Sequence, residues 1–559
     1  MTTEAPAVAS PDRRGSRWPD RALLAALTLG TVAWYVAVET HTTFPGFPLD
    51  DTWIHLQFAR NLGTGHGLSY NPGVPVAGST APLWTALLAG PAALGLDPIW
   101  STKTIGVLLT LWMVLIAAAL TERLTGSRGA GLAGGATVAL APLTTWGALS
   151  GMEVPLYALL TSAALLAYLQ ALGGRAFPGW WGLLLGLAGA ARPEAFVLFP
   201  LVAVDWMIRW RRTKTGRISG IDGWWPLLLF AAVVGVFVSV NFAVSGRPLP
   251  VTFYAKTYGM GAMLSLQEGR WEDALWAAAR YPPLFVEQYL KWVSAHVLLL
   301  AFGLPVGILA LTGVLTHLPP VPGRWLIAML PLAAAFLKGL LAPEPPLLVH
   351  DGRYVAHLLV ATSITCVVGF TVMMRQSRLR WVVILILLAG LLRLAVANVG
   401  AADRYAGMVK NINDLQRATA DWLLMYTTPD ARIATNDIGA IAYFSGRHII
   451  DTEGLITPEA IWPKRMRRFV PFLESVRPDL MIIFPEWYPE IVRHTDLFRE
   501  VYRVEAEQLA AGGPALVFYR TPWTRPEVLR APFGEAPATA PSGSGGVSPG
   551  CPPPFSSRR

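Results

Sequence analysis

The chain has 559 residues, of which 53% are hydrophobic and only 14% are charged, and its mean hydropathy is +0.44. This composition excludes an ordinary soluble protein and predicts a polytopic membrane protein. The formal net charge of +9 would suggest nucleic acid binding in a soluble protein, but the basic residues here lie largely in short loops between apolar segments. We therefore expect these residues to set membrane orientation, with no nucleic acid as a partner.

Most of the apolar segments approach the roughly 20 residues needed to cross a bilayer. One further stretch, "APLWTALLAGPAALGL" (81–96), is short and carries Gly90-Pro91 in its middle, so we expect a juxtamembrane helix at the outer surface. The predicted fold is an α-helical membrane protein with about 11 transmembrane helices. The expected spans are Ala22–Val38, Thr104–Leu120, Gly129–Ala148, Val154–Leu172, Trp180–Ala191, Ala195–Ile208, Trp224–Val244, Trp292–Leu315, Trp325–Leu341, Val355–Met374 and Trp381–Val399.

The basic loops predict the orientation of these spans. With a cytoplasmic N-terminal arm at 1–20, the loops "ERLTGSR", "GGRAFPG", "RWRRTKTGR", "VPGRW" and "RQSRLR" all fall on the cytoplasmic side, as the positive-inside rule favours. Residues 21–400 then form the transmembrane domain, with a first external loop at 40–103. The C-terminal region is expected outside the cytoplasm.

The composition changes after residue 400. Between 401 and 525 the strand-like runs "ARIAT", "HIID", "DLMIIF" and "ALVFYR" alternate with the helix-like "LQRATADWLLMY" and "RRFVPFLESV". This pattern predicts a small extracytoplasmic α/β domain. Residues 526–559 are rich in Pro, Gly and Ser, and we expect a disordered tail.

Two adjacent acids, Asp50 and Asp51, follow the first apolar segment and open the run "DDTWIHLQF". Asp50 is explained structurally as the N-cap of a helix from Asp51 to Leu62, because Asp accepts backbone N–H bonds well. A cap requires only one acid, however, and neighbouring carboxylates repel unless a cation or a ligand shares them. Such a pair suits a general base, which removes a proton from an attacking hydroxyl, or a metal ligand. Both interpretations stay open at this point.

More charged residues fall at or near the expected outer surface. Ionisable residues near spans are costly and usually face a cavity. Each has a structural explanation as well: Glu153 as a first-turn dipole partner, Glu194 beside a helix-starting proline, Lys256 snorkelling, or Arg353 in a surface pair. Together they predict a binding site for an anionic group, composed of Glu153, Arg192, Glu194, Lys256, His350 and Arg353.

The first loop, "DDTWIHLQFARNLGTGHGLSYNPGVPVAGSTAPLW", resembles that of the GT-C membrane glycosyltransferases. It is most similar to the branch that contains the mycobacterial terminal arabinofuranosyltransferase and uncharacterised bacterial relatives. "SGMEVPLY", "ARPEAF" and "ATNDIGAIAYFSGRHIIDTEGL" are similar to that branch too, so the resemblance extends over most of 22–522. It implies a protein of the bacterial plasma membrane. The implied reaction is an inverting transfer of a sugar, at the outer face, from a polyprenyl-phosphate donor to a hydroxyl of a glycan, lipid or protein acceptor.

The resemblance also implies roles by position. Asp50 is the preferred base, with Asp51 as its neighbour or replacement. Glu153 matches a second acidic position, and Arg192 lies where related enzymes place a cation for the donor phosphate. Lys256, Arg353 and His350 are further candidates for substrate binding.

The chain carries no nucleotide-binding fingerprint, which agrees with a lipid-borne donor. We expect no cofactor and no metal, since His55, His66 and His350 show no ligand spacing. Arabinofuranose and a hexose remain equal options for the sugar.

Two other classes of protein share some of these features. A transporter would also have many spans with buried charges, but the sequence shows no internal repeat and its charges crowd one face. A non-catalytic protein of cell-envelope assembly would be distinguished by an activity that does not depend on Asp50 and Asp51.

Overall fold

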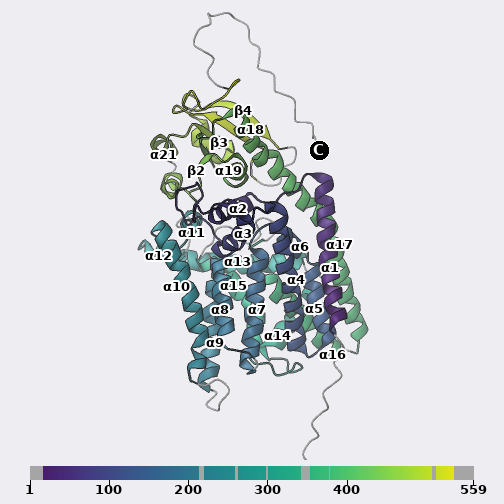
Figure 1. Cartoon of the computed structure of the whole chain (residues 1–559). Helices are drawn as coiled ribbons and strands as arrows, with labels where there is room; N and C mark the ends of the chain where they lie inside the picture. Colours follow the sequence, from purple (N-terminus) through teal and green to yellow (C-terminus); the bar gives the residue numbers. More distant parts are fainter. Residues whose placement is uncertain are drawn as a thin grey trace, which may run out of the picture.

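The computed structural model describes residues 17–174, 176–212, 220–257, 262–296, 300–341, 353–354, 356–376, 378–466, 468–506 and 512–533. A bundle of helices carries a small sheet domain at one end (Figure 1). His350 and the tail beyond 533 lie outside the described residues.

The helices of the bundle follow the order expected from the apolar segments. A broken helix pair, α5 and α6, bends by 58° at its junction, where Pro142 begins α6. The remaining bounds are α1 (Trp18–Thr42), α2 (Asp50–Gly63), α3 (Pro82–Ala93), α4 (Pro98–Thr125), α5 (Arg128–Leu140), α6 (Pro142–Leu149), α7 (Val154–Leu172), α8 (Gly179–Ala191), α9 (Leu198–Arg212), α10 (Trp225–Ser245), α11 (Val251–Thr257), α12 (Ala262–Gln267), α13 (Trp271–His296), α14 (Gly303–Thr312), α15 (Trp325–Leu341), α16 (Leu358–Gln376) and α17 (Arg380–Ile412).

The expected count of eleven spans is not confirmed. Among the described residues, six helices are long and apolar enough to cross a membrane, or seven if the bent α5 and α6 form one span. Three more apolar segments, in α8, α14 and α15, are shorter. The predicted span Trp292–Leu315 is wrong as a single helix, because its first five residues end α13 and α14 begins only at Gly303.

The 12-residue helix α3 is not among the candidate spans, and it packs on α2 at the sheet-domain end of the bundle (Figure 1). This position agrees with a juxtamembrane helix. Its length explains why, since 12 residues rise only about 18 Å and cannot cross about 30 Å of hydrocarbon.

Several arginines at helix ends make contacts between elements at the opposite end of the bundle, where α1 begins. Arg17 pairs with Glu122 at 2.9 Å, and Arg123 donates to the Leu169 carbonyl at 2.7 Å. Arg375 donates to the Thr125 carbonyl at 2.6 Å, which joins the ends of α16 and α4. The sequence prediction that the basic loops share one side is consistent with this arrangement.

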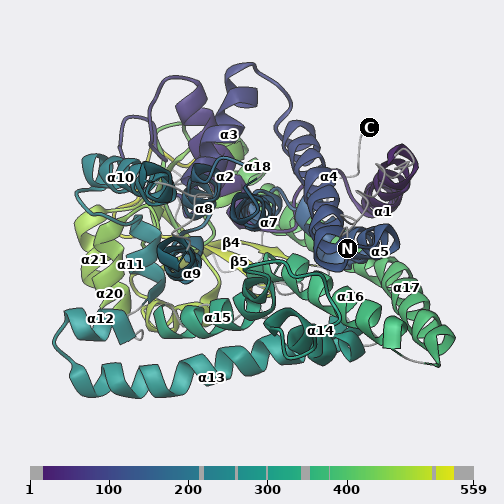
Figure 2. The same cartoon turned by 90° about the horizontal axis from the view of Figure 1, so that it is seen from below.

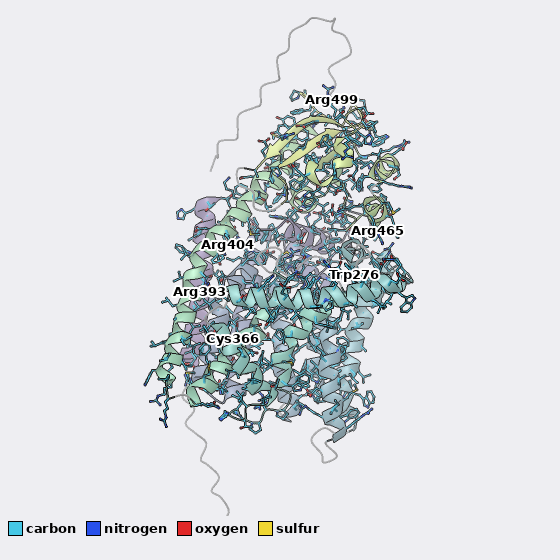
Figure 3. The ribbon with its side chains drawn as sticks, turned by 180° about the vertical axis from the view of Figure 1, so that it is seen from behind. Trp276, Cys366, Arg393, Arg404, Arg465 and Arg499 are labelled. Atoms are coloured by element: carbon cyan, nitrogen blue, oxygen red, sulfur yellow. The ribbon has the colours of Figure 1, made fainter. Side chains whose placement is uncertain are left out.

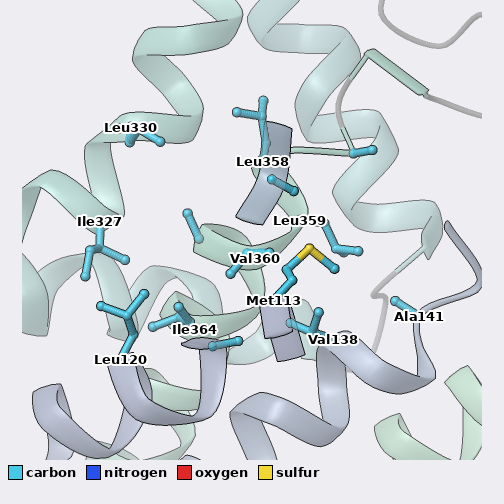
Figure 4. Close-up of a cluster of buried hydrophobic side chains, with 14 of the residues drawn as sticks. Met113, Leu120, Val138, Ala141, Ile327, Leu330, Leu358, Leu359, Val360 and Ile364 are labelled. Atoms are coloured by element: carbon cyan, nitrogen blue, oxygen red, sulfur yellow. The ribbon is translucent and has the colours of Figure 1, made fainter. Parts of the chain in front are cut away.

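Tightly packed aliphatic side chains fill the middle of the bundle. In the cluster shown in Figure 4, side chains from α4, α5, α15 and α16 meet with almost no exposed area. These include Met113, Leu120, Val138, Ile327, Leu330, Leu359 and Ile364. The outward faces of α4, α10 and α17 are apolar too, as expected for lipid contact.

The C-terminal domain is a five-stranded mixed sheet in the order β2-β1-β3-β5-β4. β1 pairs in parallel with β2 and β3, and β5 pairs antiparallel with β3 and β4. The four predicted strands are present, whereas the edge strand β4 was not predicted because its residues, "REVYRVE", are mostly charged. The bounds are β1 (Arg432–Thr435), α19 (Gly439–Ser445), β2 (His448–Asp451), α20 (Ile461–Arg465), α21 (Phe469–Val476), β3 (Leu480–Ile483), β4 (Arg499–Glu505) and β5 (Ala515–Arg520).

A single helical path joins the bundle to the sheet domain. α17 continues through a π-helical turn (Asn413–Arg417) into α18 (Ala418–Tyr426), so no break occurs at the expected boundary near residue 400. The carboxyl ends of β1 and β2 face α2 and the first loop. Tyr70 donates to the Ile438 carbonyl at 2.6 Å, and Asn71 exchanges two hydrogen bonds with Ile449.

Candidate active site

The short turn between α6 and α7 is locked against the start of α2. Thr52 donates from its hydroxyl to the Ser150 carbonyl at 2.7 Å, and the Trp84 indole donates to the Gly151 carbonyl at 3.0 Å. Gly151 has φ +71°, and a Cβ there would lie 2.3 Å from the Thr52 methyl. Only glycine permits this turn and this approach. The contact holds Asp51 and Glu153 at the edge of one cavity.

Asp50 binds the sheet domain. Its two carboxylate oxygens accept hydrogen bonds from the backbone N–H groups of Gly439 at 2.6 Å and Ala440 at 2.7 Å, the first two residues of α19. The predicted capping of its own helix is wrong, since α2 begins at Asp50 without a side-chain cap bond. Asp50 instead caps a helix almost 390 residues later in the chain.

Asp51 faces the cavity and pairs with a buried cation. Its Oδ2 lies 2.7 Å from Nη2 of Arg353, whose side chain is only 5% exposed. The same Nη2 donates to the Tyr354 hydroxyl at 2.7 Å. Nε and Nη1 of Arg353 are buried and have no hydrogen-bond partner among the described residues.

Arg192 lies between two acids. Its Nη1 is 2.7 Å from Glu153 and its Nη2 is 2.9 Å from Glu194. The side chain emerges where α8 ends at Ala191 and the chain becomes extended, before a 3₁₀ turn that begins at Pro193. His55 of α2 approaches Glu153 from the other side, with Nε2 3.6 Å from a carboxylate oxygen.

These residues surround a cavity of about 330 Å³. Its lining is mainly apolar, with a cluster of charges at one side. The charged lining residues are Asp51, Glu153, Arg192, Glu194, Lys256, Lys338 and Arg353, and the apolar ones include Phe196, Val197, Leu249, Phe253, Ala334, Ala335 and Leu337. Among the predicted residues, Asp50 is not part of this lining.

Three titratable lining residues were not predicted from the sequence: Lys338, Tyr354 and His357. The buried ring of Tyr354 contacts three cations, with Arg353 4.8 Å, Arg192 5.0 Å and Lys338 5.6 Å from its centroid. Lys338 carried a usable signal, because it is the only charged residue in the predicted span Trp325–Leu341. Tyr354 and His357 gave no such signal.

A further acid comes from the sheet domain. Asp437 follows β1 and accepts a hydrogen bond from the Gln416 amide at 2.5 Å. Burial, with the nearby Asp51 carboxylate as a further cause, raises the pKa of Asp437 to about 6. The pKa of Asp50 is likewise raised, first by burial and then by the charge of Asp437. Three carboxyl groups therefore influence one another at the junction of bundle and domain.

The part of the chain that the structure describes contains no group of three or more His, Cys, Asp or Glu side chains that could hold a metal ion. The expectation that no metal is needed stays a prediction. His350 lies outside the described residues, so its predicted role is also untested.

Comparison with solved structures identifies the architecture. ArnT from Cupriavidus metallidurans bound to undecaprenyl phosphate matches with a TM-score of 0.55 and 13% identity, over 93% of this chain and 100% of that chain. ArnT in the apo state matches with a TM-score of 0.53 and 14% identity, over 89% and 97%. The chain has the GT-C fold. This finding confirms the fold that the first-loop resemblance implied.

Arabinofuranosyltransferase AftD from Mycobacteria matches the GT-C fold of this chain with a TM-score of 0.47 and 15% identity, over 90% of this chain and 42% of that one. Residues 409–524 match a family described as "Domain of unknown function (DUF8728)". Comparison with curated protein sequences gave no match.

Proposed function

We propose that this protein is an inverting glycosyltransferase that moves a sugar from a polyprenyl monophosphate to an acceptor hydroxyl at the membrane surface. The observation that carries the proposal is the buried Arg353 guanidinium, which is shared with Asp51 and keeps two N–H-bearing nitrogens without a described partner. Leaving buried, charged donors unpaired is costly, so the site suits an anion that would accept from them.

The charges of the cavity favour a phosphodiester as this anion. Four cations and three carboxylates line it, which leaves one positive charge in excess. A sugar attached through one phosphate to a lipid carries one negative charge and balances that excess. A sugar attached through a diphosphate carries two negative charges and would leave the cavity with a net negative charge. Lys256, which also lines the cavity, makes no ion pair with a described residue and is the second candidate for the phosphate.

Asp51 is the better placed base. It lines the cavity, whereas both carboxylate oxygens of Asp50 are engaged by α19. In the proposed step, the acceptor hydroxyl transfers its proton to Asp51 while its oxygen attacks the anomeric carbon from the face opposite the phosphate. The bond between that carbon and the phosphate oxygen breaks, and the lipid phosphate leaves with the electron pair. Arg353 and Lys256 would stabilise the charge that develops on it.

Arg192 has a different place in this proposal from the one expected by position. Glu153 and Glu194 already engage its guanidinium, so we assign it to shaping the cavity around the sugar. On this proposal Arg192→Ala lowers turnover mainly by disordering Glu153 and Glu194. Donor affinity falls less in Arg192→Ala than in Arg353→Ala.

The apolar part of the cavity would hold the first isoprene units of the donor. Its lining by Phe196, Leu249 and Phe253 suits a hydrocarbon chain. ArnT of the same fold has been solved with undecaprenyl phosphate bound, which supports a lipid phosphate as the ligand class. The experiment below identifies the sugar, which is arabinofuranose or a hexose. It also identifies the acceptor, which is a glycan, a lipid or a protein.

The decisive experiment incubates the purified protein with a panel of polyprenyl-phosphate sugars and candidate acceptors and identifies products by mass spectrometry. We expect one donor to be consumed with inversion at the anomeric carbon, and Asp51→Asn to reduce turnover at least about 10²-fold. Donor binding, measured by native mass spectrometry, persists in that variant. Sugar uptake into vesicles, with no glycosylated product formed, would instead identify a transporter. Unchanged turnover in Asp51→Asn would show that Asp51 is not the base.

A further inference from the structure

Helix α13 does not follow the axis of the bundle. It covers Trp271–His296 and lies across the bundle, between the sheet domain and the far end of the bundle (Figure 3). From the N-terminal end it runs along one edge of the bundle beside α15 (Figure 2). It is not among the candidate membrane spans.

The surface of α13 divides into three sectors, since successive helical residues are 100° apart. One sector is buried against the bundle and includes Ala274, Phe285, Tyr289 and Trp292. A second is exposed and mainly apolar, with Glu272 in its first turn: Trp271 is 66% exposed, Leu275 71%, Trp276 56% and Leu290 48%. A third is exposed and mainly charged, with Asp273, Arg280, Glu287 and Lys291 beside one exposed leucine, Leu284. A helix in water needs the first and third sectors only.

A chain of ion pairs shows which way the charged sector faces. Asp273 pairs with Arg270, Arg270 pairs with Glu268 at 2.6 Å, and Glu268 lies 3.5 Å from Arg465 of the sheet domain. Figure 3 labels Arg465 at the part of the sheet domain that lies towards α13. The charged sector therefore faces the sheet domain, and the exposed apolar sector faces away from it.

The buried sector connects α13 to the cavity. A Cβ at Gly339 of α15 would lie 2.8 Å from the Tyr281 carbonyl oxygen and 2.9 Å from Pro282. α13 thus rests directly on the backbone beside Lys338, which lines the cavity. Because α13 contacts α15 beside Lys338, the position of α13 along the membrane normal also fixes the position of this wall of the cavity.

We propose that α13 lies flat in the headgroup layer of the bilayer on the sheet-domain side, with Trp271, Leu275 and Trp276 inserted among the lipids. The Arg280 guanidinium is 5.0 Å from the centroid of the Trp276 ring. This cation–π contact lies where the charged sector of α13 meets its apolar sector. Aromatic residues above hydrocarbon and charges towards water are the pattern of interfacial helices. The helix thereby holds the cavity mouth at the level where lipid phosphates lie.

Spin labels on single cysteines test this arrangement in proteoliposomes. Leu275→Cys and Ala279→Cys report the apolar sector, and Glu287→Cys and Lys291→Cys report the charged sector, all in a Cys551→Ser chain. Cys366 is buried, and the Cys551→Ser chain alone controls for its labelling. Oxygen, which concentrates in lipid, should collide more often than a water-soluble nickel chelate with labels in the apolar sector. The order should be reversed in the charged sector.

Other results decide against the proposal. Higher chelate than oxygen collisions at both Leu275 and Ala279 would place the apolar sector in water. Exclusion of both reagents from both sites would mean that protein covers it, either a second copy or another segment of this chain. Because the labels stand on exposed positions, a folded protein is expected in every variant, and the readout does not depend on glycosyltransferase activity.

Discussion

Removing the carboxylate of Asp50 should loosen the sheet domain without touching the cavity. In Asp50→Ala the N–H groups of Gly439 and Ala440 lose partners that now lie 2.6 and 2.7 Å away. Replacing an N-cap acid by alanine costs about 0.5–2 kcal/mol, and each buried donor left unpaired costs about 1–3 kcal/mol. Removal of the buried carboxyl itself, whose raised pKa reports its costly burial, offsets part of this loss.

We therefore expect a net loss of about 2 kcal/mol, which increases local opening of α19 roughly 30-fold. Hydrogen exchange measures this directly, as faster exchange of amides 439–445 relative to those of β3. Asp50→Asn keeps one acceptor oxygen and should give an intermediate rate. The matched control, Asp51→Asn, should abolish turnover and leave α19 exchange unchanged. If Asp50→Ala abolishes turnover while α19 exchanges at the wild-type rate and Asp51→Asn stays active, the division of roles between the two acids is wrong.

Three further predictions concern other groups. Arg353→Lys keeps the charge but loses the fork that binds two oxygens, so donor affinity should fall about tenfold or more, measured by native mass spectrometry; wild-type affinity would remove Arg353 from the phosphate site. The folded-state pKa of Asp437, about 6, exceeds its ordinary value, so the folded protein holds this proton more tightly and loses stability as pH rises from about 4 to about 6, by at most about 3 kcal/mol. Thermal unfolding against pH should show a smaller slope in Asp437→Asn, and an unchanged slope would contradict this origin. In a chain lacking Cys551, Arg499→Cys on the sheet domain should react with an impermeant thiol reagent in intact cells, whereas Arg378→Cys at the opposite end should react only after lysis; the reverse pattern would invert the orientation.

The sequence was informative where local pattern reports structure. Apolar segments located most bundle helices, four of the five strands were predicted, and the first-loop motif indicated the GT-C fold. The count of spans failed because α8, α14 and α15 are short, and because the apolar run from Trp292 joins the end of the crossing helix α13 to α14. Neither length nor hydropathy distinguishes a helix along the bundle from one across it.

The site shows a similar limit. Residue type and proximity to spans singled out Asp51, Glu153, Arg192 and Arg353, and the structure brings them to one cavity. Their pairing was not predictable, since Asp51 and Arg353 are 302 positions apart and no local pattern joins them. The same holds for Asp50, whose partners belong to another domain.

The trans cap on α19 has a consequence for biogenesis. The Asp50 carboxylate is made 389 residues before the Gly439 amide that it accepts from, and the Tyr70 and Asn71 contacts wait for almost as long. At roughly 5–20 residues per second, a ribosome needs about 20–80 s to cover that distance. During this interval the first loop and α2 lack the sheet-domain partners that fix them. A nascent chain that ends before residue 439 therefore carries α2 without the backbone N–H groups that Asp50 binds in the complete fold.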